Sequence, residues 1–173
     1  MLLKKSLESI CLFLFILFAD KCYATDLNLK APQCILTSLN DAKTIELKQF
    51  EGKVVYVDFW ASWCGPCATS FPFMNNLSRD LKAQGLEVIG VNLDENLEES
   101  KQFLEQQPAN FIIASDPEQQ CAKQFGLKAM PSSYLIDRKG LLRHVHIGFR
   151  PAEALEFRAL AEKLLAEPID NSK

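Results

Sequence analysis

Two cysteines separated by two residues, Cys64 and Cys67, lie between a strongly apolar run and a stretch with helical periodicity. The apolar run, Val54 to Trp60, is rich in β-prone residues and nearly continuous, which predicts a central strand buried on both faces. Beyond the cysteines, apolar residues recur at helical spacing to about Gln84. The sequence therefore predicts a buried strand that leads into a helix, with a cysteine pair where the helix begins.

A cysteine in the first turn of a helix has a specific chemical use. The unpaired backbone N–H groups and the positive end of the helix dipole favour a thiolate at Cys64, and a thiolate is the species that attacks a disulfide. Cys67 lies one turn further on the same side, so it can close a small ring with Cys64. Pro66 suits the start of a helix, and Gly65 lets a substrate backbone come close. We predict that Cys64 attacks and Cys67 resolves the mixed disulfide, with no cofactor.

One acid, Asp58, interrupts the apolar strand. Burial should raise the pKa of this carboxyl, because desolvation disfavours the charged form. Asp58 lies six residues before Cys64, which places it beneath the start of the helix. There it could accept the proton of Cys67 as that sulfur attacks. The alternative is a structural aspartate bonded to backbone or water.

The rest of the chain alternates strands and helices. We expect a hairpin over 35–47 with its turn at Asn40-Asp41, strands over 86–91, 111–114, 133–136 and 142–147, and helices over 96–107 and 152–166. A further helix is expected to begin at Asp116-Pro117, as N-cap and first helical residue, and to stop at Gly126. This order predicts an α/β fold with a mixed central sheet flanked by helices.

The first 24 residues have the pattern of a secretory signal peptide. Lys4 and Lys5 precede an uncharged run from Ile10 to Ala19, and Ala24 ends a cleavage site of small residues. The open alternatives are an uncleaved membrane anchor and a lipoprotein lipidated at Cys22. We therefore expect one domain over 25–173, secreted across the inner membrane to the periplasm. Its length of about 150 residues is ordinary for one hydrophobic core.

Charge and cysteine content limit the partners and the redox state. The chain has a formal net charge of −3 and no basic stripe, which excludes nucleic acid. An exported protein meets an oxidising compartment, where cysteines outside the reactive pair can bond. Cys34 and Cys121 stand where apolar residues would pack. They are either two inert buried thiols or a second, structural disulfide.

Other polar and aromatic residues have simpler interpretations. His144 and His146 share a face of one predicted strand, but nothing brings that strand to the cysteines, so no metal site is expected. The acidic residues Asp94, Glu95, Glu98 and Glu99 are interpreted as a solvated helix start. Of the two tryptophans, we expect one in the core and one, Trp63, beside Cys64.

The motifs together resemble the TlpA/ResA branch of the thioredoxin-like superfamily. The residues that carry this resemblance are Asp58-Phe59-Trp60-Ala61-Ser62-Trp63-Cys64-Gly65-Pro66-Cys67, Ala31-Pro32, Gly52-Lys53-Val54-Val55, Gly90-Val91-Asn92 and Met130-Pro131-Ser132-Ser133-Tyr134-Leu135-Ile136-Asp137. The resemblance covers about 31–148. It implies a thioredoxin-like fold with an N-terminal β-hairpin and a helix–strand insertion near 96–114.

The resemblance also implies a substrate site and a redox role. Pro131 would be cis, which turns the backbone so that Met130 can pair with an extended substrate segment. Trp63, Gly65 and Pro66, which neighbour the cysteines in the sequence, are the other candidate substrate-binding residues. The branch dedicated to cytochrome c maturation usually has a glutamate three residues after the second cysteine. Here that residue is Ser70, which favours a broader periplasmic reductase.

The Gly-Pro pair between the cysteines resembles that of thioredoxin, a reductant with a potential on the order of −270 mV. We therefore expect a monomeric reductase of disulfides in exported proteins, recharged by a membrane thiol donor of the DsbD type. A thiol oxidant or isomerase of the same fold is one alternative, and a copper or zinc carrier that uses the dithiol is another. A peroxiredoxin is not expected, because 61–63 lack the threonine that binds peroxide.

Overall fold

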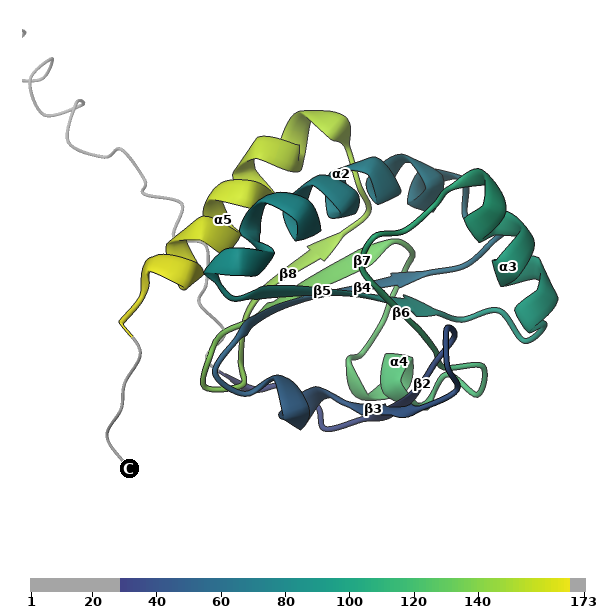
Figure 1. Cartoon of the computed structure of the whole chain (residues 1–173), viewed down its shortest axis with the longest axis horizontal. Coiled ribbons are helices and arrows are strands. Elements are labelled where there is room, and N and C mark those ends of the chain that lie inside the picture. Colours follow the sequence, from purple (N-terminus) through teal and green to yellow (C-terminus); the bar gives the residue numbers. More distant parts are fainter. Residues whose placement is uncertain (1–28, 169–173) are drawn as a thin grey trace, which may run out of the picture.

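The computed structural model describes residues 29–168, which form one sheet of eight strands with helices on both faces (Figure 1). The strand order is β1-β8-β7-β4-β5-β6-β2-β3. The strands are β1 (Leu29–Lys30), β2 (Ile35–Ser38), β3 (Thr44–Glu46), β4 (Val54–Trp60), β5 (Leu86–Asn92), β6 (Ile112–Ser115), β7 (Ser132–Ile136) and β8 (Leu141–Ile147). The helices are α2 (Gly65–Leu81), α3 (Leu97–Gln106), α4 (Gln120–Gln124) and α5 (Ala154–Ala166), with short 3₁₀ turns at Leu47–Phe50, Lys82–Gln84 and Pro151–Glu153.

The sheet is mixed, as expected. β4, β5 and β6 run parallel, and β7 pairs antiparallel with both β4 and β8. The predicted hairpin is also confirmed, since β2 and β3 pair antiparallel and add to the edge of β6. β4 therefore lies between two neighbours, and all seven of its residues are buried. The strand that leads into the cysteine pair is the centre of the fold.

Two hydrophobic clusters cover the two faces of the sheet. In Figure 1, α2 and α5 lie over one face, and α4 with the β2–β3 hairpin lies under the other. Side chains alternate along a strand, so Tyr56 and Trp60 pack in the cluster under α2, whereas Val57 and Phe59 pack in the opposite cluster. Asp58 shares the face of Tyr56 and Trp60. The single acid of β4 is thereby directed to the start of α2.

Helix α2 begins where the sequence predicted. Cys64 is its N-cap and Pro66 is within the first turn, where a missing N–H breaks no helical bond. The helix continues through Pro72 to Leu81, a 3₁₀ turn follows, and Gly85 ends it with a φ of 101°. That left-handed conformation is the one that glycine adopts without strain.

Two expectations about local structure need correction. The helix expected from Asp116-Pro117 begins only at Gln120, because Gln119 adopts a left-handed conformation with a φ of 56°. Asp116 still caps the segment, since its carboxylate accepts hydrogen bonds from the backbone N–H groups of Gln120 and Ala122. The edge strand β1, which pairs with β8, was not expected at all. It is two residues long, which is too short to show the alternation of apolar and polar residues by which a strand is predicted.

The expected signal peptide, 1–24, lies outside the described residues. Within 29–168, no helix combines the length and the apolar character needed to cross a membrane. The location of the protein therefore rests on the sequence pattern.

Candidate active site

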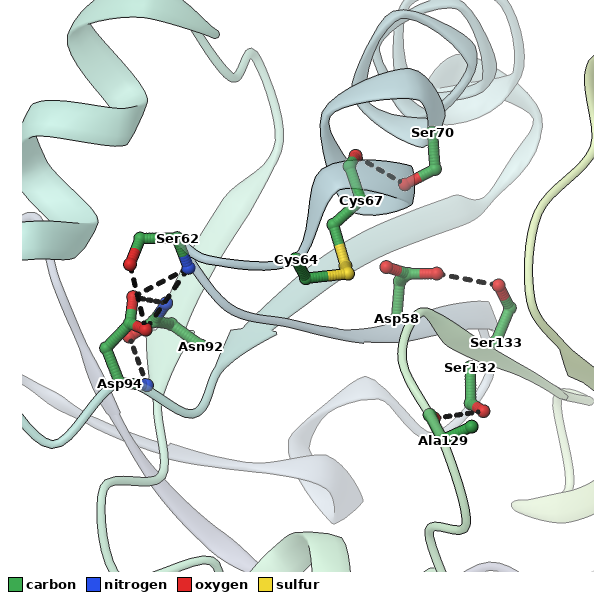
Figure 2. Close-up of a disulfide and its surroundings, with 10 residues drawn as sticks. All are labelled: Asp58, Ser62, Cys64, Cys67, Ser70, Asn92, Asp94, Ala129, Ser132 and Ser133. Carbon is green, nitrogen blue, oxygen red and sulfur yellow. Dashed lines mark hydrogen bonds between the residues drawn. A yellow bond between two sulfur atoms is a disulfide. The ribbon is translucent and has the colours of Figure 1, made fainter.

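The site is built around a disulfide between Cys64 and Cys67 at the start of α2 (Figure 2). Their Cα atoms are 5.3 Å apart, and the backbone N–H of Cys67 donates to the carbonyl of Cys64. Cys67 is fully buried, whereas Cys64 is 5% exposed and lines a surface groove. An incoming sulfur can therefore reach Cys64 first, which fits the predicted order of attack and resolution.

Asp58 lies behind the disulfide on β4 and is 1% exposed. Its Oδ2 accepts a hydrogen bond of 2.7 Å from the Ser133 hydroxyl, while Oδ1 has no hydrogen-bond partner. Burial raises the pKa of this carboxyl to about 7, and the Ser133 hydrogen bond offsets part of that effect. In Figure 2 the carboxyl lies between the disulfide and Ser133. A group that gains and loses a proton near neutral pH beside a dithiol is suited to general acid–base chemistry.

A groove of about 570 Å³ opens in front of Cys64. Residues 63–66 form one wall, and residues 127–130 form the other. The Met130–Pro131 peptide bond is cis, as the resemblance implied, and Trp63 is 70% exposed at the rim. Trp60, by contrast, is fully buried. Of the predicted substrate-binding residues, Trp63, Gly65 and Pro66 therefore lie on one side of the groove and Met130 on the other, while Pro131 follows Met130 outside the lining.

Sequence reasoning missed a buried network that holds the loop before Cys64. Asp94 is 2% exposed, not solvated, so its interpretation as part of an acidic helix start was wrong. Its carboxylate accepts hydrogen bonds from the backbone N–H and the hydroxyl of Ser62 and from the amide of Asn92. The segment that follows β5 thereby fixes the chain at Ser62, two residues before Cys64 (Figure 2). The signal in the sequence was the placement of polar residues where a buried parallel strand ends, beside the end of β4.

Ser70 occupies the position where the cytochrome c maturation branch usually has glutamate. It is fully buried, and its hydroxyl donates to the carbonyl of Cys67 at 2.9 Å. The side chain thus completes a hydrogen bond within α2 and adds no acid. Asp58 is the acid that lies behind the disulfide.

The two histidines lie on β8, as expected. His146 Nε2 is 3.1 Å from Glu153 Oε2, and the imidazole packs against the Phe157 ring. Within 29–168, no three His, Cys, Asp or Glu side chains are grouped as metal ligands. His146 belongs to a contact between β8 and the segment before α5.

A second disulfide joins Cys34, just before β2, to Cys121 on α4. Both residues are buried, and 87 positions separate them in the sequence. α4 precedes the loop that forms one wall of the groove. The bond therefore links that region to the N-terminal hairpin on the face opposite α2, away from the reactive pair.

Removing this second disulfide should destabilise the protein without stopping its chemistry. For a closed loop of this length, the loss of restraint on the unfolded chain predicts that C34A/C121A lowers the free energy of unfolding by about 4.5 kcal/mol. Urea unfolding measures the loss, and C64A/C67A is the matched control because its much shorter loop predicts a smaller effect. An unchanged free energy of unfolding in C34A/C121A would contradict a structural role.

A dithiol at the start of a helix, a buried acid behind it and a cis-proline loop across a groove define a class of protein. That class is the thioredoxin-like thiol–disulfide oxidoreductases, which exchange disulfides through a cysteine pair. Comparisons with known proteins agree with this class and narrow it to a family.

The sequence profile of the Redoxin family matches residues 27–164. Thiol-disulfide oxidoreductase ResA of Bacillus thuringiensis (strain Al Hakam) is 37% identical over 139 residues, which cover 80% of this chain and 79% of the relative. ResA of Bacillus subtilis (strain 168) is 33% identical over 68% of this chain and 65% of its own length. This chain belongs to the Redoxin family, among its ResA/TlpA-like thiol–disulfide oxidoreductases.

Solved structures give the same fold. A protein assigned as thiol:disulfide interchange protein DsbE of Chlorobium tepidum is 46% identical, with a TM-score of 0.73 over 79% of this chain and 96% of that one. A protein assigned as a disulfide isomerase of Bacteroides thetaiotaomicron is 26% identical, with a TM-score of 0.74 over 82% and 91%. The predicted thioredoxin-like fold is confirmed, and the protein is a thiol–disulfide oxidoreductase.

Proposed function

We propose that this protein reduces disulfide bonds in exported proteins, with Cys64 as the attacking sulfur, Cys67 as the resolving sulfur and Asp58 as the proton acceptor. One observation carries the proposal: Cys64 lines the groove, while Cys67 and the unpartnered oxygen of Asp58 are buried behind it. This arrangement separates attack, which needs access to a client, from resolution, which needs a base protected from water.

In the first step the Cys64 thiolate attacks one sulfur of a client disulfide. The client S–S bond breaks, a bond forms between Cys64 and the client, and the other client sulfur leaves as a thiolate with the electron pair. The client chain would lie extended in the groove, against Met130 and cis Pro131 on one wall and residues 63–66 on the other.

In the second step Cys67 resolves the mixed disulfide. Its S–H proton passes to Asp58, its sulfur attacks Cys64, and the client leaves as a second thiolate, which takes a proton from water. Two electrons have then moved to the client, and the protein holds the Cys64–Cys67 disulfide that the structure contains. A further cycle needs a donor that reduces this bond.

The proposed setting is the periplasm. The expected signal peptide over 1–24 supports export, and a membrane thiol donor of the DsbD type is the partner that would recharge a reductase in an oxidising compartment. The proposed chemistry needs no second subunit and is assigned to a monomer, since one chain supplies the groove and both cysteines.

The direction of electron flow is tested by equilibrating the Cys64–Cys67 pair with glutathione redox buffers, together with an insulin-reduction assay. A reductase with a Gly-Pro pair should equilibrate near the thioredoxin potential of about −270 mV and reduce insulin. A potential near −120 mV would instead support the oxidant or isomerase. Metal retained in stoichiometric amount without insulin reduction would support a metal carrier, and either result would overturn the proposal.

A further inference from the structure

Behind Asp58 lies a chain of hydrogen bonds among three buried side chains. The Tyr56 hydroxyl is 2.7 Å from Ser133 Oγ, and Ser133 Oγ is 2.7 Å from Asp58 Oδ2. None of the three residues is more than 4% exposed. Ser133 on β7 lies directly opposite Asp58 in the sheet register, and Tyr56 precedes Asp58 by two residues on the same face of β4. The pairing of β4 with β7 therefore sets the geometry of this series of hydrogen bonds.

The direction of these hydrogen bonds follows from the number of hydrogens. Burial, and the neighbouring Asp58 charge, hold the pKa of Tyr56 well above its ordinary value, so the phenol keeps its hydrogen. Tyr56 donates this hydrogen to Ser133, and Ser133 donates its own to Asp58 Oδ2. Oδ2 is then occupied as an acceptor, and the free position for a proton is Oδ1, which has no partner. Figure 2 shows this second oxygen turned to the side of the disulfide.

We propose that Ser133, held by Tyr56, is a positioning residue that orients the Asp58 carboxyl so that it accepts the proton of Cys67 at Oδ1. The inference rests on the proposed function, because it refines how Asp58 acts within it. As the Cys67 sulfur attacks Cys64, the S–H bond breaks and an O–H bond forms at Oδ1. Ser133 and Tyr56 keep their own hydrogens throughout. Their hydrogen bonds therefore orient the Asp58 carboxyl without taking part in the proton transfer.

The other groups around Asp58 define what else could affect its titration. β5 places Gly90 opposite Asp58 and so presents no side chain there. Beyond Ser133, the register places His146 of β8 next in the row, paired with Glu153. The titratable groups on the same face of the sheet as Asp58, in these and the neighbouring rows, are Tyr56 on β4 and His144 and His146 on β8. Glu153 before α5, which contacts His146, and Cys64 and Cys67 at the start of α2 complete the set. A H146Q variant therefore belongs in the test, to separate the histidine from the Ser133 hydroxyl.

The test compares S133A, S133T, Y56F and H146Q with a matched control, S78A. Ser78 is also buried, but it lies near the C-terminal end of α2, and its hydroxyl donates a hydrogen bond to the backbone carbonyl of Asn110. Two quantities are measured: the titration midpoint of the Asp58 carboxyl by ¹³C NMR in the oxidised protein, and the pH profile of mixed-disulfide resolution in single turnovers.

Loss of the Ser133 hydrogen bond removes a donor to the charged form of Asp58, so the midpoint should rise. We expect S133A to raise it by about one pH unit, since hydrogen bonds to charged groups have this magnitude. Resolution at pH 7 should then fall about fivefold, in proportion to the ionised fraction. S133T should restore the wild-type midpoint, Y56F should shift it less in the same direction, and S78A and H146Q should leave it unchanged.

The variant D58N separates the two proposals. If D58N slows resolution but S133A and Y56F keep the wild-type midpoint and profile, the positioning role is overturned and the proposed function stands. If D58N resolves the mixed disulfide at the wild-type rate at every pH, the role of Asp58 in the proposed function fails, and the positioning role fails with it. S133T and Y56F keep the question decidable even if S133A does not fold.

Discussion

Replacing Cys64 by serine is expected to abolish disulfide reduction, with a fall in turnover of roughly a thousandfold or more. A serine hydroxyl stays protonated at neutral pH and cannot displace a sulfur from a disulfide, so no mixed disulfide forms. Insulin reduction in the presence of dithiothreitol measures the loss. C34A/C121A is the control, because its cysteines are buried on the opposite face of the sheet.

Replacing Cys67 by serine should give a different result, because it removes resolution and leaves attack intact. The protein should then remain joined to its client through Cys64, as a band on a non-reducing gel that dithiothreitol releases. The same variant identifies clients by mass spectrometry of the captured proteins. Turnover by C64S at the wild-type rate, or capture by C64S in place of C67S, would contradict the assigned order of the two cysteines.

The sequence predicted the parts of the site that depend on neighbours in the chain. One short segment contains strand β4, the N-terminus of α2 and the two cysteines, Cys64 and Cys67. The residue pattern of this segment alone predicts its local structure. The raised pKa of Asp58 followed from the same segment, because an acid inside a continuous apolar strand must be buried.

The parts that the sequence did not predict depend on contacts between distant segments. In the sequence, nothing distinguishes Ser133 from other residues of its predicted strand. Only the register of β7 against β4 brings it opposite Asp58, 75 positions away. Asp94 lies among acidic neighbours that suggest a solvated helix start, and only its contact with Ser62, 32 positions away, explains its burial. Register and loop packing are set by the whole core and not by local pattern.

Asp58 should also make the folded protein less stable as pH rises, and D58N should reverse this. The pKa of the carboxyl is about 7 in the folded protein against 3.8 ordinarily, so the folded state binds a proton that the unfolded state has released between these values. The contribution of this proton to the free energy of unfolding is therefore fully present below about pH 4, and it is lost as the pH rises to 7 and above. At about 1.4 kcal/mol per pH unit, the decrease reaches about 4 kcal/mol.

An asparagine at position 58 has the same shape but does not ionise, so D58N should unfold at higher urea concentration than the wild type above pH 7 and at a similar concentration near pH 4. Urea unfolding of the oxidised proteins, followed by the fluorescence of Trp60 and Trp63, measures both conditions. D80N is the control of opposite sign, since hydrogen bonds from Arg158 and Arg79 lower the pKa of the exposed Asp80. Removing the Asp80 carboxylate should therefore bring no gain in stability to urea at high pH.

The combination of outcomes in D58N decides why a costly acid is present in the core. A variant that is more stable at pH 8 and slower in resolving the mixed disulfide shows that the burial cost of Asp58 supports proton transfer from Cys67. A variant that is more stable and equally active would leave Asp58 without a catalytic role. A variant with no gain in stability would mean that Asp58 ionises in the folded protein as it does in the unfolded chain, and the proton acceptor would have to be sought elsewhere in the site.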